Sequence, residues 1–95
     1  MLTRIVKMEV TEEFSQQFLN FFNTLQTKIQ AFDGCKSAQM LQDLHSKTTF
    51  FTISIWEDES ALNNYRDSEL FIETWKFVKP NFTQKAAAWS LISSK

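Results

Sequence analysis

Glycine, proline, cysteine and histidine each occur once in this chain of 95 residues, and each scarcity excludes a class of protein. A single glycine, Gly34, cannot build a glycine-rich phosphate loop or a dinucleotide fingerprint, because both need several glycines for close backbone approach. A single cysteine cannot form an internal disulfide, and one cysteine with one histidine cannot complete a structural zinc site. We therefore expect no cofactor and no metal.

Charge of one sign and long apolar runs are also missing. The formal net charge is −1, and scattered Lys and Arg residues leave no electrostatic footprint for nucleic acid or an anionic membrane. The chain turns polar at Thr3 and Arg4, too early for a signal peptide, and no apolar run approaches the ~20 residues of a membrane span. We expect a soluble, cytoplasmic protein that binds neither nucleic acid nor membrane.

Aromatic residues, in contrast, are abundant. They make up 15% of the chain, as ten Phe, three Trp and one Tyr. The length predicts one domain over residues 1–95, and a domain of this size buries only about 60% of the surface that its unfolded chain exposes. So much ring surface is more than one small core readily hides. The composition predicts a pocket lined with aromatic residues, a subunit interface, or both.

The pattern of apolar residues predicts four strands and two helical regions. Alternation predicts strands over residues 2–10, 36–43, 48–56 and 86–92, and spacings of three and four predict a long amphipathic helix over residues 11–32. Asp58 and Ser68 are expected to cap the two parts of a broken helix that ends at Val78. Short-hairpin and right-handed crossover rules favour an α+β fold, the ferredoxin-like βαββαβ order with an antiparallel sheet.

The third predicted strand is apolar on both faces. Phe51, Ile53 and Ile55 occupy one face, and Phe50 and Trp56 occupy the other. Helices on one side of the sheet would cover one set and leave the other facing water or a partner. We therefore expect a homodimer built through the sheets, with Phe50 or Trp56 and part of the last strand at the interface.

The stretch from Ser54 to Phe71 carries a recognisable pattern. It reads Trp-x-Asp-x-x-Ala-Leu from Trp56, then a ring at Tyr65, then x-x-Ser-x-x-Phe to Phe71. This pattern resembles the strand-to-helix signature of the antibiotic biosynthesis monooxygenase family, and the element order and the segment from Phe32 to Cys35 also agree. The resemblance implies a dimeric α+β barrel, in which each protomer keeps a cavity between its sheet and its helices.

The resemblance also indicates which chemistry is missing. In the haem-degrading branch of the family an iron-ligating His follows the ring residue by ten positions, where this chain has Trp75. Indole cannot ligate iron, because its nitrogen has no free lone pair. Many oxygenase-like members carry His at the positions that Tyr65 and Leu70 occupy here. The resemblance therefore implies an activity without haem and without the usual imidazoles.

Tyr65 is the candidate catalytic residue. On a helix it shares a side with Leu62, so it is expected to face the cavity, where its phenol would hydrogen-bond or deprotonate a phenolic substrate. The alternative interpretation is an amphipathic core residue with its hydroxyl at the surface. The candidate substrate-binding residues are Arg4, Phe18, Phe22, Trp56 and Trp75.

These binding residues also have plainer interpretations. Aromatic residues at helical spacing or at a strand end pack in a core more often than they contact a ligand. Arg4, on the otherwise apolar even face of its strand, must pair, extend to solvent or contact an anion. His45 is expected in an exposed hairpin, Cys35 as a small structural thiol, and the acidic run at Asp58 as a helix cap.

Two functions fit this sequence. The first is a cofactor-independent, monooxygenase-like enzyme that acts on a small aromatic or quinol-type molecule, with desolvation and orientation supplied by an apolar cavity. The second is a dimeric barrel that binds an apolar small molecule without turnover, which the missing imidazoles favour.

Overall fold

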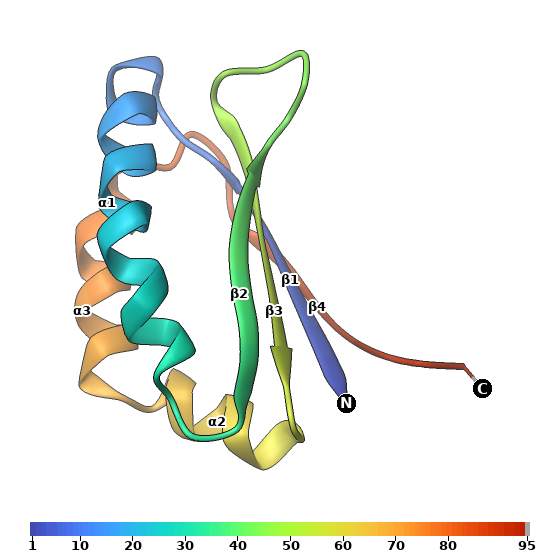
Figure 1. Cartoon of the computed structure of the whole chain (residues 1–95). Coiled ribbons are helices and arrows are strands. Elements are labelled where there is room, and N and C mark those ends of the chain that lie inside the picture. Colours follow the sequence, from blue (N-terminus) through green and yellow to red (C-terminus); the bar gives the residue numbers. More distant parts are fainter. Residues whose placement is uncertain (95) are drawn as a thin grey trace.

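The computed structural model describes residues 1–94, which fold into a four-stranded sheet with the helices on one face (Figure 1). The elements, in chain order, are β1 (Leu2–Glu9), α1 (Glu12–Gln30), β2 (Cys35–Gln42), β3 (Thr49–Trp56), α2 (Glu59–Arg66), α3 (Glu69–Val78), the 3₁₀ turn η1 (Lys79–Asn81) and β4 (Ala87–Ile92). The predicted α+β class and βαββαβ order are confirmed. No helix within residues 1–94 is long and apolar enough to cross a membrane.

The sheet is antiparallel throughout, with the strand order β2-β3-β1-β4. The central strand β1 pairs with β3 on one side and with β4 on the other, as the split βαβ arrangement requires. In the pairing of β2 with β3 the register shifts between Cys35 and Ser37. The alternation pattern of β2 was too weak to predict this irregularity.

Side-chain alternation sorts the apolar residues between the two faces of the sheet. Phe50 and Trp56 of β3 lie beneath the helices, and their side chains are 0% exposed. The prediction that one of them lies at a sheet-to-sheet interface is therefore wrong. Because β3 alternates, Phe51, Ile53 and Ile55 take the other, open face.

The helix α1 forms where its caps and its apolar stripe predict it. The Thr11 hydroxyl accepts a hydrogen bond from the backbone N–H of Phe14, which satisfies one of the free donors of the first turn. Its buried residues recur every three or four positions, which places them on one stripe against the sheet: Phe14, Phe18, Phe22, Leu25 and Ile29. This helix forms the back wall of the space in which the site lies.

The second helical region is broken between α2 and α3. Asp58 caps α2 by accepting from the backbone N–H of Ala61 at 2.9 Å, and Ser68 caps α3 by accepting from Phe71 at 3.2 Å. The Ser68 hydroxyl also donates to the carbonyl of Tyr65. The break lets α2 cover one end of the sheet while α3 packs beside α1 (Figure 1).

Candidate functional site

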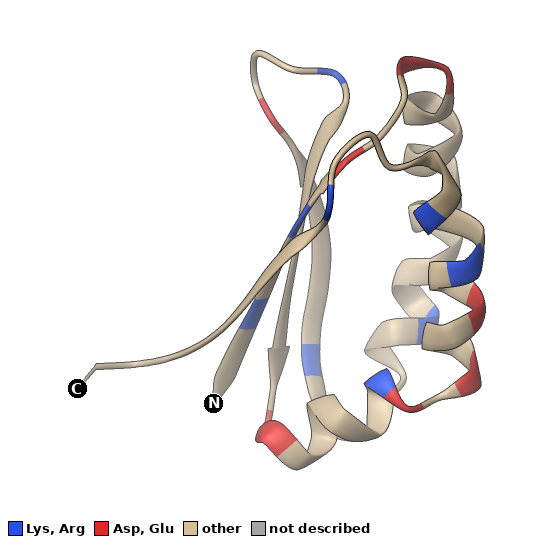
Figure 2. Cartoon of the chain, turned by 180° about the vertical axis from the view of Figure 1, so that it is seen from behind, with Lys and Arg blue, Asp and Glu red and all other residues tan. Residues whose placement is uncertain are grey.

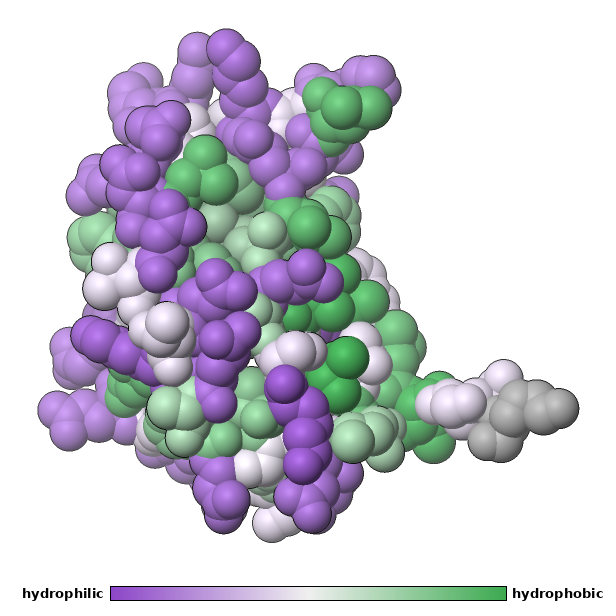
Figure 3. Space-filling view, viewed as in Figure 1, coloured by the Kyte–Doolittle hydropathy of each residue, from purple (hydrophilic) through white to green (hydrophobic). Residues whose placement is uncertain are grey.

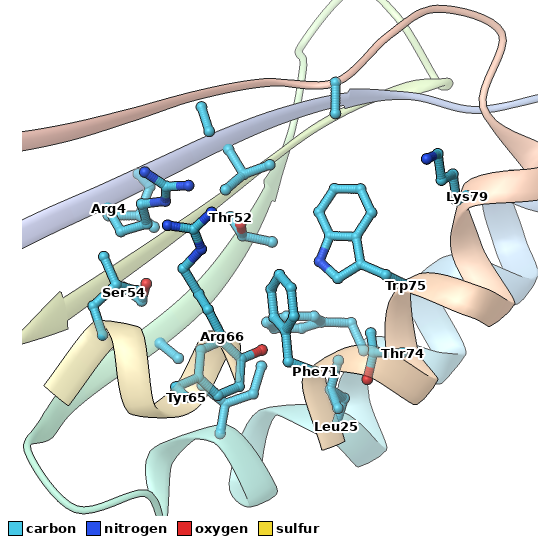
Figure 4. A pocket seen from close by; sticks show the side chains of 18 of the residues that line it. Arg4, Leu25, Thr52, Ser54, Tyr65, Arg66, Phe71, Thr74, Trp75 and Lys79 are labelled. Carbon is cyan, nitrogen blue, oxygen red and sulfur yellow. The ribbon is translucent and has the colours of Figure 1, made fainter. Parts of the chain in front are cut away.

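A cavity of about 590 Å³ lies between the sheet and the helices (Figure 4). Five of the six residues predicted from the sequence to form a site line it, and they come from β1, α1, α2 and α3: Arg4, Phe18, Phe22, Tyr65 and Trp75. Its volume lies within the range of small-molecule sites, and most of its wall is apolar. The cavity is therefore large enough for a molecule of two or three fused rings.

Trp56 is the predicted binding residue that does not line the cavity. Its indole is fully buried beneath α2, and its Nε1–H donates to the Ser54 hydroxyl at 2.9 Å. The Trp56 ring stacks against Tyr65 with centroids 5.1 Å apart. Trp56 therefore supports Tyr65 from behind rather than contacting a ligand.

Tyr65 is fixed in place by rings on three sides. Besides Trp56, Phe32 and Phe71 contact it edge-on, each with a centroid distance of 5.2 Å. Within residues 1–94 its hydroxyl makes no hydrogen bond, yet no fully buried polar side-chain atom is left unpaired there. The hydroxyl oxygen must therefore reach open space, and the cavity that Tyr65 lines provides it.

The environment of Tyr65 keeps its phenol neutral. Burial, followed by the effect of the nearby Cys35 thiol, raises the pKa of Tyr65 to about 12. A phenol with this pKa remains protonated at neutral pH, so it can donate a hydrogen bond but cannot accept a proton as a base. Of the two predicted roles, the geometry and the pKa favour hydrogen bonding to a substrate oxygen over deprotonation of it.

The raised pKa predicts a measurable pH dependence of stability. Because the folded state prefers the protonated phenol, the stability that Tyr65 contributes is fully present below pH 10 and is lost as the pH rises from about 10 towards 12. Tyr65 is the only tyrosine, so tyrosinate absorbance reports it alone. We expect the tyrosinate absorbance to rise only as the fold is lost. The Tyr65→Phe variant should lack this loss of stability at alkaline pH. Ionisation near pH 10 with native circular dichroism would contradict the assignment.

The wall continues from Tyr65 through rings of α3 and of the segment after it. The ring centroids of Phe71 and Trp75 are 5.7 Å apart. Phe82 contacts Trp75 edge-on, with a distance of 5.5 Å between the ring centroids. All three line the cavity. Phe71 and Phe82 are site residues that the sequence did not predict, although the spacing of Phe71 and Trp75 on one helix was a usable signal.

The charged residues that line the cavity are all basic. They are Arg4, Arg66, Lys79 and Lys85, and no Asp, Glu or His accompanies them within residues 1–94. Over the molecule as a whole, basic and acidic residues are both spread across the helices and strands (Figure 2). The basic lining is therefore a local property of the cavity. Arg66 was missed because its neighbour Tyr65 occupies the buried side of α2, and only its long side chain returns to the cavity.

The other polar candidates stay apart from the cavity lining. His45 is exposed in the turn between β2 and β3, where its backbone N–H donates to Asp43 Oδ1 at 2.8 Å. Burial raises the pKa of the half-buried Cys35 thiol. Within residues 1–94 no three His, Cys, Asp or Glu residues gather as metal ligands would.

Comparison with protein-family models identifies one family. Residues 1–76 match the family model described as "Antibiotic biosynthesis monooxygenase". No curated protein matches the sequence.

Solved structures give the same fold. The crystal structure of an antibiotic biosynthesis monooxygenase is 19% identical, with a TM-score of 0.93 and coverage of 100% of both chains. Rv0793 from Mycobacterium tuberculosis is 16% identical, with a TM-score of 0.89, over 99% of this chain and 95% of that one. SnoaB, a cofactor-independent oxygenase from Streptomyces nogalater, is 12% identical, with a TM-score of 0.85, over 99% of this chain and 93% of that one. With its match to the family model over residues 1–76, the chain belongs to the antibiotic biosynthesis monooxygenase family.

Proposed function

We propose that this protein is a cofactor-independent, monooxygenase-like enzyme that acts on a small aromatic or quinol-type molecule. The observation that carries the proposal is the Tyr65 hydroxyl, which lines a ring-walled cavity and makes no hydrogen bond within residues 1–94. An unpaired donor in an apolar cavity is suited to a ligand oxygen. Membership of the family and the likeness to SnoaB support the oxygenase chemistry.

The reaction needs little from the protein beyond orientation and charge. A quinol can react with O₂ so that one oxygen atom enters the ring and the other leaves as water. A naphthohydroquinone would give a hydroxynaphthoquinone, with all four electrons supplied by the substrate. The chain would hold the substrate ring against Phe71 and Trp75 and would donate a hydrogen bond from Tyr65 to its oxygen.

The basic lining supports the deprotonated substrate. A quinol reduces oxygen as its phenolate, and neighbouring positive charges lower the pKa of the phenol from which the phenolate forms. Arg4, Arg66, Lys79 and Lys85 supply these charges. No carboxylate or imidazole of residues 1–94 lines the cavity to take the proton, so we assign that role to solvent.

We further propose that the enzyme is a homodimer joined through the open face of the sheet. In the observed register Trp89, Ile5 and Ile53 are cross-strand neighbours on this face. Trp89 and Leu91 are each 46% exposed. Apolar atoms gather along the strand side of the molecule, while hydrophilic atoms cover the helices (Figure 3). Face-to-face packing of two sheets would remove this apolar surface from water.

One observation favours a second function, a dimeric small-molecule-binding barrel without turnover. The cavity lining within residues 1–94 offers no base, because its Tyr65 phenol is neutral and its other ionisable groups are cations. A binder needs only the ring walls and the polar groups that orient its ligand. The two functions differ in oxygen consumption, which decides between them.

The test is oxygen uptake with a naphthohydroquinone, in a buffer that contains a chelator and no added flavin or metal. We expect uptake above the uncatalysed rate, one O₂ for each hydroxyquinone formed, and no release of hydrogen peroxide. Tyr65→Phe should lower kcat by roughly 100-fold, as the loss of one aimed hydrogen-bond donor does in other enzymes. Uncatalysed oxidation of the quinol gives hydrogen peroxide instead. Added catalase, which returns oxygen from peroxide, therefore distinguishes the uncatalysed reaction from the enzymatic one.

The control is His45→Ala, which removes the only imidazole at an exposed turn distant from the cavity lining. It should keep the wild-type rate. Binding of the quinol without any oxygen uptake above background would rule out the enzyme and leave the binding protein. Unchanged turnover in Tyr65→Phe would remove Tyr65 from the mechanism.

A further inference from the structure

Two arginine side chains from different elements meet at one end of the cavity. Arg4 comes from β1 and Arg66 is the last residue of α2. Figure 4 shows both guanidinium groups near Ser54 and Thr52, at the end away from Lys79. The two are close enough that the charge of Arg66, after the larger effect of burial, lowers the pKa of Arg4.

Neither arginine has an acidic partner among residues 1–94. The ion pair recorded in this part of the chain joins Lys76 to Glu73, on α3. Arg4 donates instead to the neutral hydroxyl of Ser90, at 2.8 Å. Two like charges held together without a counter-ion repel each other, and most of their N–H donors have no acceptor within residues 1–94.

The position of Arg4 also needs an explanation. It lies on the face of β1 that carries the buried residues Leu2 and Met8 beneath the helices. Its cross-strand neighbours there, Ser54 of β3 and Ser90 of β4, are both small. The strands therefore leave a recess around a half-buried cation, with hydroxyl groups at its edges.

We propose that the ligand of this cavity is an aromatic carboxylate, whose carboxylate lies between Arg4 and Arg66 and whose ring packs against Phe71 and Trp75. This inference rests on the function proposed above, because it names the class of substrate for the same site. The planar fork of a guanidinium matches the two oxygens of a carboxylate. The anion would also cancel the repulsion between the two arginines, and nothing acidic in the described lining would oppose it.

The test compares naphthoate with naphthamide, a neutral molecule of nearly the same shape. Quenching of tryptophan fluorescence measures binding, because Trp75 lines the cavity. We expect naphthoate to bind roughly 10- to 100-fold more tightly at low ionic strength, as charge-assisted hydrogen bonds allow. Arg66→Gln and Arg4→Gln should each remove most of that preference while the affinity for naphthamide stays the same.

Two variants guard the test against misfolding and against a general effect of charge. Arg66 is exposed, so Arg66→Gln is expected to fold even if Arg4→Gln does not. Lys47→Gln removes one positive charge from the exposed turn between β2 and β3, and it should keep the full preference for naphthoate.

The outcomes separate this inference from the proposed function. Equal affinity of the wild-type protein for both compounds would overturn the carboxylate while the aromatic cavity and the oxygenase remain. A preference that survives in both arginine variants would also overturn it. Binding of neither compound would overturn both proposals. Arginine-dependent binding of naphthoate without oxygen uptake from any quinol would support the ligand class and refute the enzyme.

Discussion

Phe51→Asp should convert the proposed homodimer into single chains, with a rise in the dimer dissociation constant of roughly 100-fold or more. Phe51 lies on the open face of β3, where it is the cross-strand neighbour of Leu41 and Lys7. In a two-fold dimer the substitution buries an unpaired carboxylate twice, once from each protomer. Native mass spectrometry at low micromolar concentration measures the result directly.

Two further variants make this measurement specific. Leu44→Asp makes a similar change at a side chain that is 88% exposed in the turn after β2, and it should leave the dimer intact. Phe50→Asp, one position away, should instead unfold the chain, because Phe50 is 0% exposed beneath the helices. A folded wild-type protein of single-chain mass would contradict the dimer and the barrel with it.

Gly34→Ala should lower the free energy of unfolding by about 2 to 4 kcal/mol, the sum of a left-handed backbone penalty and overpacking. Gly34 has a φ of 84°, a region that residues with a Cβ rarely adopt. An added Cβ would also lie 2.5 Å from the Cβ of Ala61 on α2. Urea denaturation at a fixed protein concentration measures the loss, since the proposed dimerisation would make stability depend on protein concentration.

Ala61→Gly is the matched partner for this variant. Combined with Gly34→Ala it removes the clash but keeps the strained φ, so the double variant should lose less stability than the two single losses added together. Strict additivity would show that the close approach of Gly34 to Ala61 of α2 contributes nothing. A loss below about 0.5 kcal/mol in Gly34→Ala, the range of neutral surface changes, would contradict both causes.

Most of the fold could be predicted from the sequence because its local signals agree with one another. The apolar stripe of α1 and the caps at Asp58 and Ser68 are set within a few residues, and each lies where it was expected. The alternation of β3 was equally plain. Alternation divides residues between two faces, however, and it does not say which face the helices cover. That is why Phe50 was assigned to the interface, although it lies in the core.

The candidate site could be predicted in part for the same reason. Helical spacing placed Tyr65 and Trp75 towards the sheet, and the structure brings both to one cavity. Trp56 was misplaced because a strand end gives no sign of whether its ring meets a cavity or another ring. Arg66 could not be found, since its direction depends on how a long, flexible side chain bends across the end of α2. Arg4 and Arg66 are far apart in the sequence, and only the folded chain brings their side chains close together.

The indole N–H signals test directly whether this cavity binds a small aromatic molecule. The three tryptophans lie in three environments, with Trp75 in the cavity wall, Trp56 buried behind Tyr65 and Trp89 on the open face of the sheet. In a ¹H–¹⁵N spectrum titrated with naphthoate, the Trp75 signal should move most, Trp56 less, and Trp89 should stay in place. Movement of the Trp89 signal with a stationary Trp75 signal would place the ligand on the open face of the sheet and contradict binding in the cavity.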